Sequence, residues 1–424
     1  MRITRVVLLA SGLTFLAFNA QAFEVDAVVG VDVGYSTNPS QVDDGEQPQW
    51  ITSPSASLAV TRNTENLVLE SDYTANRRIF HDDIFDDEDA VTGTTRLDWG
   101  VVPNRVNLEL LHFRTESTID SVRNNTPANR QEVDRISGEL SVDVPVSENQ
   151  TITVLGRYSD QSFSETQNNS ATETVEVSYQ IGTSAARGWG VFASESETEF
   201  DDFSGADYDT TSFGIRSNSR TSNTSFEIEA AYTDLESGPF NEEFDGLSGS
   251  LAIMRGIGSP FRWGITASRE FSDRSSELDR GTIDINRPIP LQDSGLVDVF
   301  KRTSYELMGA YESDSWQTTL RLSTEDDESN NSNRSTQAEV VDLEIVRRIS
   351  RTVSLNFLGS AFQTEFEDLA RDDDTISASL ALEWQRSNAL EITFRVLYEE
   401  RNSDDPLSEF EELYTVIGFE YRLF

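Results

Sequence analysis

An alternation of apolar and polar side chains recurs along this chain from its first strand-like segment to its last residues. It is strictest in residues 174–181, 226–233, 376–385 and 390–399, where every second side chain is apolar and its neighbours are polar or small. A β-strand with one apolar face needs this period of two, whereas an amphipathic helix needs a period near 3.6. No helical period persists at length, so the sequence predicts an all-β fold.

The segments that connect the alternating stretches are short and long in turn. Short connections are expected around Asn63, Pro103, Ser147, Ala186, Thr221, Gly258, Asp314, Ser350 and Ser387. Long polar ones are expected at residues 37–49, 77–90, 117–132, 163–172, 197–208, 273–295, 325–336, 364–374 and 401–409. This regularity predicts a transmembrane up-and-down antiparallel β-barrel of about 18–20 strands, with short periplasmic turns and long acidic extracellular loops.

Residues 1–22 have the features of a secretory signal peptide. Arg2 and Arg5 precede an apolar stretch at 6–18, and Ala20-Gln21-Ala22 is a small-x-small cleavage site. The apolar stretch is shorter than a membrane helix requires, which favours cleavage over an uncleaved anchor. We therefore expect removal of residues 1–22.

Residues 23–424 are then expected to form a single outer-membrane β-barrel domain without a plug domain. This mature chain would have 424 − 22 = 402 residues, and its first strand is predicted near Glu24. So early a strand leaves no room for a folded plug before the barrel, which disfavours a gated receptor of the siderophore type.

Composition excludes several classes of protein. The chain has no Cys, so it is neither a lipoprotein nor a disulfide scaffold. The mean hydropathy of −0.45 suits a barrel, since only alternate residues of each strand meet lipid. The net charge is −42, from 75 acidic and 33 basic residues, and such a chain would be repelled by the phosphates of nucleic acid.

Tryptophan and tyrosine are sorted to opposite ends of the predicted strands. One set lies near short turns, namely Trp99, Trp189, Trp263, Trp316 and Trp384, and the other lies toward long loops, namely Tyr35, Tyr73, Tyr158, Tyr232 and Tyr398. A bilayer selects aromatic belts at its two interfaces, because these rings have an apolar body and a polar edge. A soluble β-sandwich, the alternative all-β fold, has no reason to sort them in this way.

The last segment, YTVIGFEYRLF, is similar to the terminal strand that the outer-membrane assembly machinery recognises. Ile417, Phe419, Tyr421 and Leu423 share one face, and Phe424 is last but one residue out of phase with them. We therefore expect the bacterial outer membrane as the location. The expected partners are its lipid and lipopolysaccharide, and the barrel assembly machinery during biogenesis.

The N-terminal stretches VGVDVGYSTNPS and WITSPSASLAVTRNTENLVLESDYTANRRIF resemble the opening of a known family. The matching features are Gly34-Tyr35 followed by Asn38, Ser53-Pro54, and Asp72-Tyr73 before an aromatic loop. The family consists of outer-membrane β-barrel porins often found beside exopolysaccharide or exosortase (PEP-CTERM) systems. The resemblance implies a link to polysaccharide export and its components, and it carries no catalytic residues.

The chain has only two histidines, which argues against an enzyme, because barrel hydrolases need a His with a Ser or carboxylate partner. His112 is interpreted as an interfacial or lumen side chain. His81 opens the acidic loop HDDIFDDEDA, which could bind a divalent cation but matches no EF-hand and is better read as a solvated loop. We predict a protein that is not an enzyme and that uses no cofactor or metal.

The polar phase of the predicted strands faces the lumen. It contains Glu139, Arg157, Glu176, Arg216, Glu227, Glu229, Arg262, Glu306, Arg321, Glu391 and Arg395. Charges of both signs keep a lumen wet, and 18–20 strands leave an aqueous channel. The alternative is that the same residues form closed arginine–carboxylate ladders that occlude it.

The loops favour a pore but leave a second function open. The loop at 273–295 carries Arg287-Pro288-Ile289-Pro290 and is predicted to fold into the lumen and constrict it. Acidic loops favour cations at the mouth and repel acidic polymers. The first hypothesis is a porin-like channel. The second is a structural or surface-interaction barrel that works through its acidic loops, and a barrel enzyme is a distant third.

Overall fold

The computed structural model describes residues 23–43, 47–82, 84–119, 123–166, 168–184, 187–201, 207–237, 242–273, 299–329, 335–366 and 371–424. Their strands are β1 Glu24–Ser36, β2 Gln49–Asn63, β3 Leu67–Phe80, β4 Glu88–Val102, β5 Val106–Thr118, β6 Arg130–Ser147, β7 Gln150–Phe163, β8 Ser170–Ser184, β9 Arg187–Phe200, β10 Tyr208–Arg220, β11 Thr224–Ser237, β12 Glu242–Arg255, β13 Phe261–Asp273, β14 Val299–Glu312, β15 Trp316–Ser329, β16 Thr336–Arg348, β17 Val353–Phe366, β18 Arg371–Gln385, β19 Leu390–Ser403 and β20 Phe410–Arg422. A 3-10 turn, η2, spans Pro127–Asn129. No helix in these ranges has the length and apolar character needed to cross a membrane.

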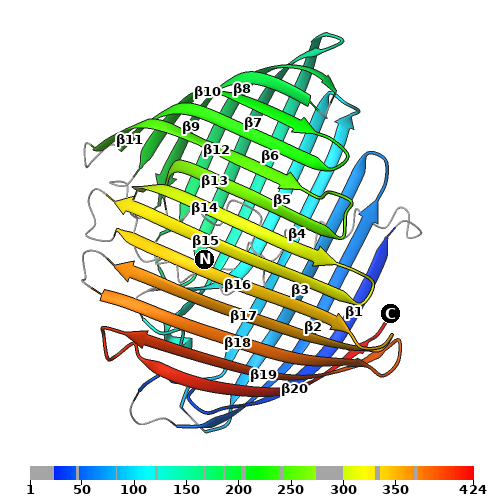
Figure 1. Ribbon diagram of the computed structural model, residues 1–424, viewed down its shortest axis with the longest axis vertical. Helices are drawn as coiled ribbons and strands as arrows, with labels where there is room; N and C mark the ends of the chain where they lie inside the picture. Colours follow the sequence, from blue (N-terminus) through cyan, green and yellow to red (C-terminus); the bar gives the residue numbers. More distant parts are fainter. Residues whose placement is uncertain are drawn as a thin grey trace, which may run out of the picture.

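The strands form one 20-stranded antiparallel sheet that closes on itself (Figure 1). Each strand pairs with the next along the chain, and β1 pairs with β20 through Val31 and Phe419. Closure leaves no free edge among the described strands, which is the requirement for β-structure in lipid, where an unpaired backbone group has no water to bond. The all-β barrel predicted from the alternation is thus confirmed, at the upper end of the expected strand number.

The register sorts the side chains to two faces. One continuous row joins Val33, Ile417, Phe394 and Leu382 on neighbouring strands, and all four are exposed on the outside. Because strand residues alternate between faces, the intervening polar residues point inward. The outer face therefore meets lipid and the inner face lines a lumen.

The two ends of the barrel are connected differently. At one end, Pro103 and Asn104 turn β4 into β5, with the amide of Arg105 donating to the carbonyl of Val102 at 2.9 Å. Asn104 has φ 57°, a left-handed conformation that Asn tolerates better than most residues. The other end carries the longer loops. The loop at 273–295, predicted to constrict the lumen, lies outside the described residues except for Asp273.

Candidate functional site

The register places all eleven predicted lumen charges on the inner face. One close pair among them is Arg157 on β7 and Glu139 on β6, with Nη2 and Oε2 2.6 Å apart. Arg216 on β10 contacts Glu176 and is the cross-strand neighbour of Glu229. These residues come together because β6–β7 and β8–β11 are adjacent in the barrel wall.

The other predicted lumen charges are spread around the wall. Arg262 on β13 lies 3.8 Å from Glu312, a partner that was not predicted. Glu227, Glu306, Arg321, Glu391 and Arg395 face the lumen from β11, β14, β15 and β19. Further inward carboxylates join them, namely Asp32, Glu70, Asp72, Asp98, Glu109, Asp143, Asp342, Glu344, Glu383 and Glu420. The inner wall is therefore polar, carries both signs of charge and is richer in carboxylates.

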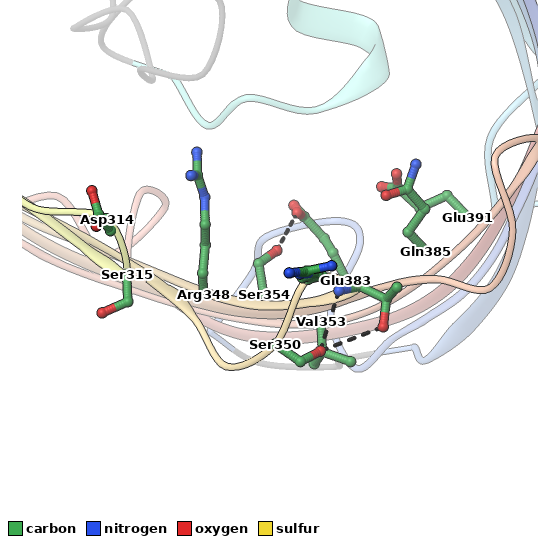
Figure 2. Close-up of a pocket in the computed structure, with 11 residues that line it drawn as sticks. Asp314, Ser315, Arg348, Ser350, Val353, Ser354, Glu383, Gln385 and Glu391 are labelled. Carbon is green, nitrogen blue, oxygen red and sulfur yellow. Dashed lines mark hydrogen bonds between the residues drawn. The ribbon is translucent and has the colours of Figure 1, made fainter.

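A cavity of about 590 Å³ opens on the inner wall at the short-turn end of β15–β19 (Figure 2). Arg348, Glu383 and Glu391 rise from the strands toward the interior. Ser354 Oγ donates to Glu383 at 2.8 Å, and Asn356 donates to the same carboxylate at 2.5 Å. Glu391 is thus one predicted lumen residue that lines a polar hollow open to solvent, and Arg216, Glu227 and Glu229 line a second hollow of about 370 Å³.

The ten predicted belt aromatics all lie on the outer face by strand register. Trp189 and Tyr232 are among the most exposed of them, at 55% and 51%. A further aromatic, Trp50, is exposed beside Tyr35 with ring centroids 5.1 Å apart. Trp50 was not predicted as a belt residue because it lies at the end of a long loop rather than near a short turn.

The terminal strand has its apolar residues outward. Ile417, Phe419 and Tyr421 on β20 are exposed on the lipid face, and the strand ends at Arg422. Leu423 continues the pairing, since its amide donates to the carbonyl of Ala27 at 2.7 Å. Phe424 is 68% exposed, and its carbonyl still accepts from the amide of Ala27 at 3.4 Å.

A buried polar cluster lies at the long-loop end of β18 and β19. The guanidinium of Arg371 donates twice to Asp373, at 2.8 and 2.7 Å. Arg401 and Ser403 donate to the same carboxylate. The side chains of Arg371, Asp373 and Arg401 are 6%, 3% and 4% exposed, so other parts of the chain cover them inside the mouth.

Part of that cover is the segment 123–129 between β5 and β6. Asn124 is buried, and its side-chain amide donates to the carbonyl of Gln41 at 2.5 Å and to that of Leu407 at 3.4 Å. Its amide oxygen accepts from Arg401 at 3.4 Å. β5 and β19 are not neighbours in the barrel wall, so Asn124 ties three loops together across the mouth.

Two more ion-pair groups surround the mouth. Arg302 on β14 forms a two-pronged pair with Asp327 on β15, at 2.7 and 2.6 Å, and both side chains are nearly buried. Arg78 on β3 contacts Glu88 at 3.0 Å and also contacts Glu116. Such pairs hold strand ends in fixed positions at the rim.

Aromatic side chains on the inner face narrow the lumen at the long-loop end of the barrel. They stand at strand ends and are buried, namely Phe80, Phe163, Phe200, Tyr208, Phe300, Phe366 and Phe410. Phe113, Val133 and Phe163 pack as one cluster. This collar was not predicted, although it has a sequence signal: an aromatic residue in the polar phase at a strand–loop junction.

The two histidines occupy different places. His81 lies in the loop after β3, and its Nε2 is 2.8 Å from Thr52 Oγ1. Arg77 of β3 donates to Asp87 in the same loop and thereby lowers the pKa of that carboxyl. His112 lies on the outer face of β5, where Asp134 is 3.2 Å from its Nε2. Among the described residues no three His, Asp or Glu side chains are grouped as metal ligands.

Comparison with protein families bears on the last six strands. Residues 314–423 match the family model described as "Putative beta-barrel porin 2". This match covers 110 of the 424 residues, and the region is similar to that family. The porin resemblance noted from the N-terminal residues is confirmed, as is the location in the bacterial outer membrane, while the association with exopolysaccharide systems stays a prediction. No curated protein sequence matches the chain.

Solved structures with this architecture are outer-membrane barrels of very low identity. The FrpB iron transporter of Neisseria meningitidis (F5-1 variant, apoprotein form) is 8% identical with a TM-score of 0.50, covering 94% of this chain and 81% of its own. The siderophore receptor PirA of Pseudomonas aeruginosa is 13% identical with a TM-score of 0.47, covering 93% and 80%. OccK2 (OpdF) of Pseudomonas aeruginosa is 9% identical with a TM-score of 0.41, covering 95% and 100%. At 8% identity and a TM-score of 0.50, the likeness to FrpB concerns the fold alone.

Proposed function

We propose that this porin-family barrel is a gated aqueous channel that prefers cations. The observation that carries the proposal is the segment around Asn124, hydrogen-bonded across the mouth above a wide, charged inner wall. A 20-stranded barrel is too wide for side chains alone to fill. A charged wall also stays hydrated where an occluding core would be apolar.

The preference for cations follows from the net negative charge of the inner wall. Inward carboxylates such as Asp32, Asp72 and Glu229 outnumber the inward guanidinium groups, several of which are already paired. Fixed negative charge in a low-dielectric wall concentrates cations and repels anions. The preference should weaken at high salt, because the Debye length falls from about 10 Å at 0.1 M to about 3 Å at 1 M.

The experiment is a reversal-potential measurement on the refolded barrel under a tenfold KCl gradient. We expect a potential on the cation-selective side, and a smaller one for Glu229→Arg. Glu229 faces the lumen beside Arg216, so its replacement changes wall charge and leaves the outer face intact. An anion-selective potential, or no change in Glu229→Arg, would contradict the proposal.

The finer function, a role in exopolysaccharide export, rests on the family resemblance. The acidic wall and loops favour a neutral polymer, or an acidic one carried with bridging divalent cations. Uptake or release of a neutral labelled glycan by vesicles that contain the barrel tests this. Exclusion of every glycan while small cations pass would limit the channel to ions and small solutes.

The second candidate is a structural or surface-interaction barrel without ion flow. It is favoured by the buried Arg371–Asp373–Arg401 cluster, which would close the mouth permanently if the loops never part. Loop deletions that abolish cell-surface binding and leave the barrel non-conducting would select this candidate.

A further inference from the structure

The outer face of β3–β6 carries a stripe of polar side chains where lipid would be expected. It starts at Ser71 and Thr95, whose hydroxyl oxygens are 2.8 Å apart. Thr95 donates to the phenol oxygen of Tyr73 at 3.2 Å, and that oxygen is hydrogen-bonded to Nδ1 of His112. His112 Nε2 then reaches Asp134 at 3.2 Å. We call Ser71, Tyr73, Thr95, His112 and Asp134 the outer polar stripe.

The stripe is built into the strands rather than formed by loose side chains. Tyr73 on β3 reaches His112 on β5 only by crossing β4 at Gly93. A Cβ at Gly93 would lie 2.7 Å from the Tyr73 ring and 2.2 Å from the carbonyl oxygen of Asp72. Gly93 also has φ +155°, which favours glycine. The backbone is therefore shaped to let the phenol lie across it.

Charges of both signs continue the stripe toward the loop end. Arg114 contacts Glu132 and lies 3.8 Å from Asp134. All three have partly exposed side chains, at 31–35%. The outer surface here presents an acid, a base and a hydroxyl network together.

The same level of the barrel is apolar on the outer face of β17–β19. Thr95 and Leu380 lie at a comparable depth, because each is four residues along its strand from a belt tryptophan, Trp99 and Trp384 respectively. The cross-strand neighbours of Leu380 are Phe357 and Val396, whereas those of Thr95 are Ser71 and His112. A charged group on a lipid-facing strand costs about 2–4 kcal/mol at the bilayer midplane and about 0–1 near the interfaces. The stripe is thus poorly suited to acyl chains.

Small residues lie alongside the stripe on the outer face. Ala56, Ala75 and Gly138 share its side of β2, β3 and β6, and Gly156 follows on β7. A Cβ at Gly156 would have no atom within 4 Å, so the surface there is open. Small residues allow two backbones to approach closely inside a membrane, where polar contacts between chains are sheltered from water.

We propose that the outer face of β3–β7 binds a second copy of this chain. Two copies inserted in the same direction bring their stripes to the same depth, so polar groups meet polar groups without any further adjustment. The mixture of Arg114 and His112 with Glu132 and Asp134 is complementary to itself, as a contact between identical chains requires. Lipid is then replaced by hydrogen-bonding partners at the stripe and by close packing at the glycines.

The test uses two glycines that differ only in location. Gly156 on β7 and Gly309 on β14 both face outward, and a Cβ added to either one would have no atom within 4 Å. Gly156→Trp places a bulky ring at the proposed contact, and Gly309→Trp places it on the lipid-facing wall. The full-length processed protein is extracted from outer membranes in mild detergent, and its mass is measured by sedimentation or native mass spectrometry.

We expect the wild type and Gly309→Trp to have a mass that is an integer multiple of the chain, and Gly156→Trp to be a monomer. His112→Leu, which interrupts the stripe, should shift the population toward monomer at least tenfold while the barrel still shows heat-modifiable migration. A monomeric wild type, a mass that includes a different protein, or equal behaviour of the two Trp variants would overturn the proposal.

Discussion

A guanidinium nitrogen of Arg401 on β19 lies 3.4 Å from the side-chain oxygen of Asn124, although 277 residues separate them in the chain. The contact joins the β5–β6 segment to β19, a strand that neighbours neither β5 nor β6 in the barrel wall. Asn124 adds two donated bonds, to Gln41 and Leu407, so one side chain holds three loops. Each of the two neutral bonds contributes about 0.5–1.5 kcal/mol and the bond from the charged guanidinium about 1.5–3 kcal/mol, so a few kcal/mol hold the segment closed.

The first prediction concerns the buried ion pair beside the mouth. Arg302→Met leaves Asp327 nearly buried without its two-pronged partner, and such a loss costs about 3–5 kcal/mol. We expect a matching drop in the free energy of unfolding, measured by tryptophan fluorescence in urea with lipid vesicles. Arg77→Met is the control, because Arg77 pairs with Asp87 on an exposed surface and should leave the unfolding midpoint in place. Equal midpoints for the two variants would contradict the prediction.

The second prediction concerns the glycine beneath Tyr73. Gly93→Ala forces a side chain into a φ of +155° and against the Asp72 carbonyl oxygen, a strain of about 1–3 kcal/mol. Gly156→Ala, with open space at its Cβ, should be neutral. Thermal unfolding followed by heat-modifiable migration distinguishes the two. The role given to Gly93 is wrong if both alanine variants unfold at the same temperature.

The third prediction concerns the long loop at 273–295. Deleting residues 277–292 should raise single-channel conductance if this loop constricts the lumen, because its Arg287–Pro290 tip would be removed. Deleting residues 330–334 from the β15–β16 loop controls for loop loss in general. Unchanged conductance after the longer deletion would leave the Asn124 segment as the constriction.

Much of the fold follows from the sequence because period two is a property of the strand backbone. The alternation in residues 376–385 and 390–399 sets which side chains of β18 and β19 face out, and the sorted aromatics mark the two interfaces. His112 could have been placed outward by counting in phase from Leu108 and Leu110, but the neighbouring Leu110-Leu111 obscured the phase.

The mouth could not be predicted in the same way. The contact between Asn124 and Arg401 depends on how loops fold over the barrel end, and no local pattern encodes it. The cluster of Arg371, Asp373 and Arg401 reads in sequence as an acidic solvated loop, although the structure buries it. Long-range packing of loops decides such sites, and strand periodicity carries no information about it.

The measurement that tests the gated channel most directly compares single-channel records of the wild type, Asn124→Ala and Asn125→Ala in a planar bilayer. Asn125 is the matched control, since it is exposed and accepts hydrogen bonds from Arg130, the first residue of the adjoining strand β6. We predict discrete cation-carrying steps for the wild type and Asn125→Ala, and a severalfold higher open fraction for Asn124→Ala. No conductance in any of the three correctly folded barrels would contradict the gated channel and leave the surface-interaction function in its place.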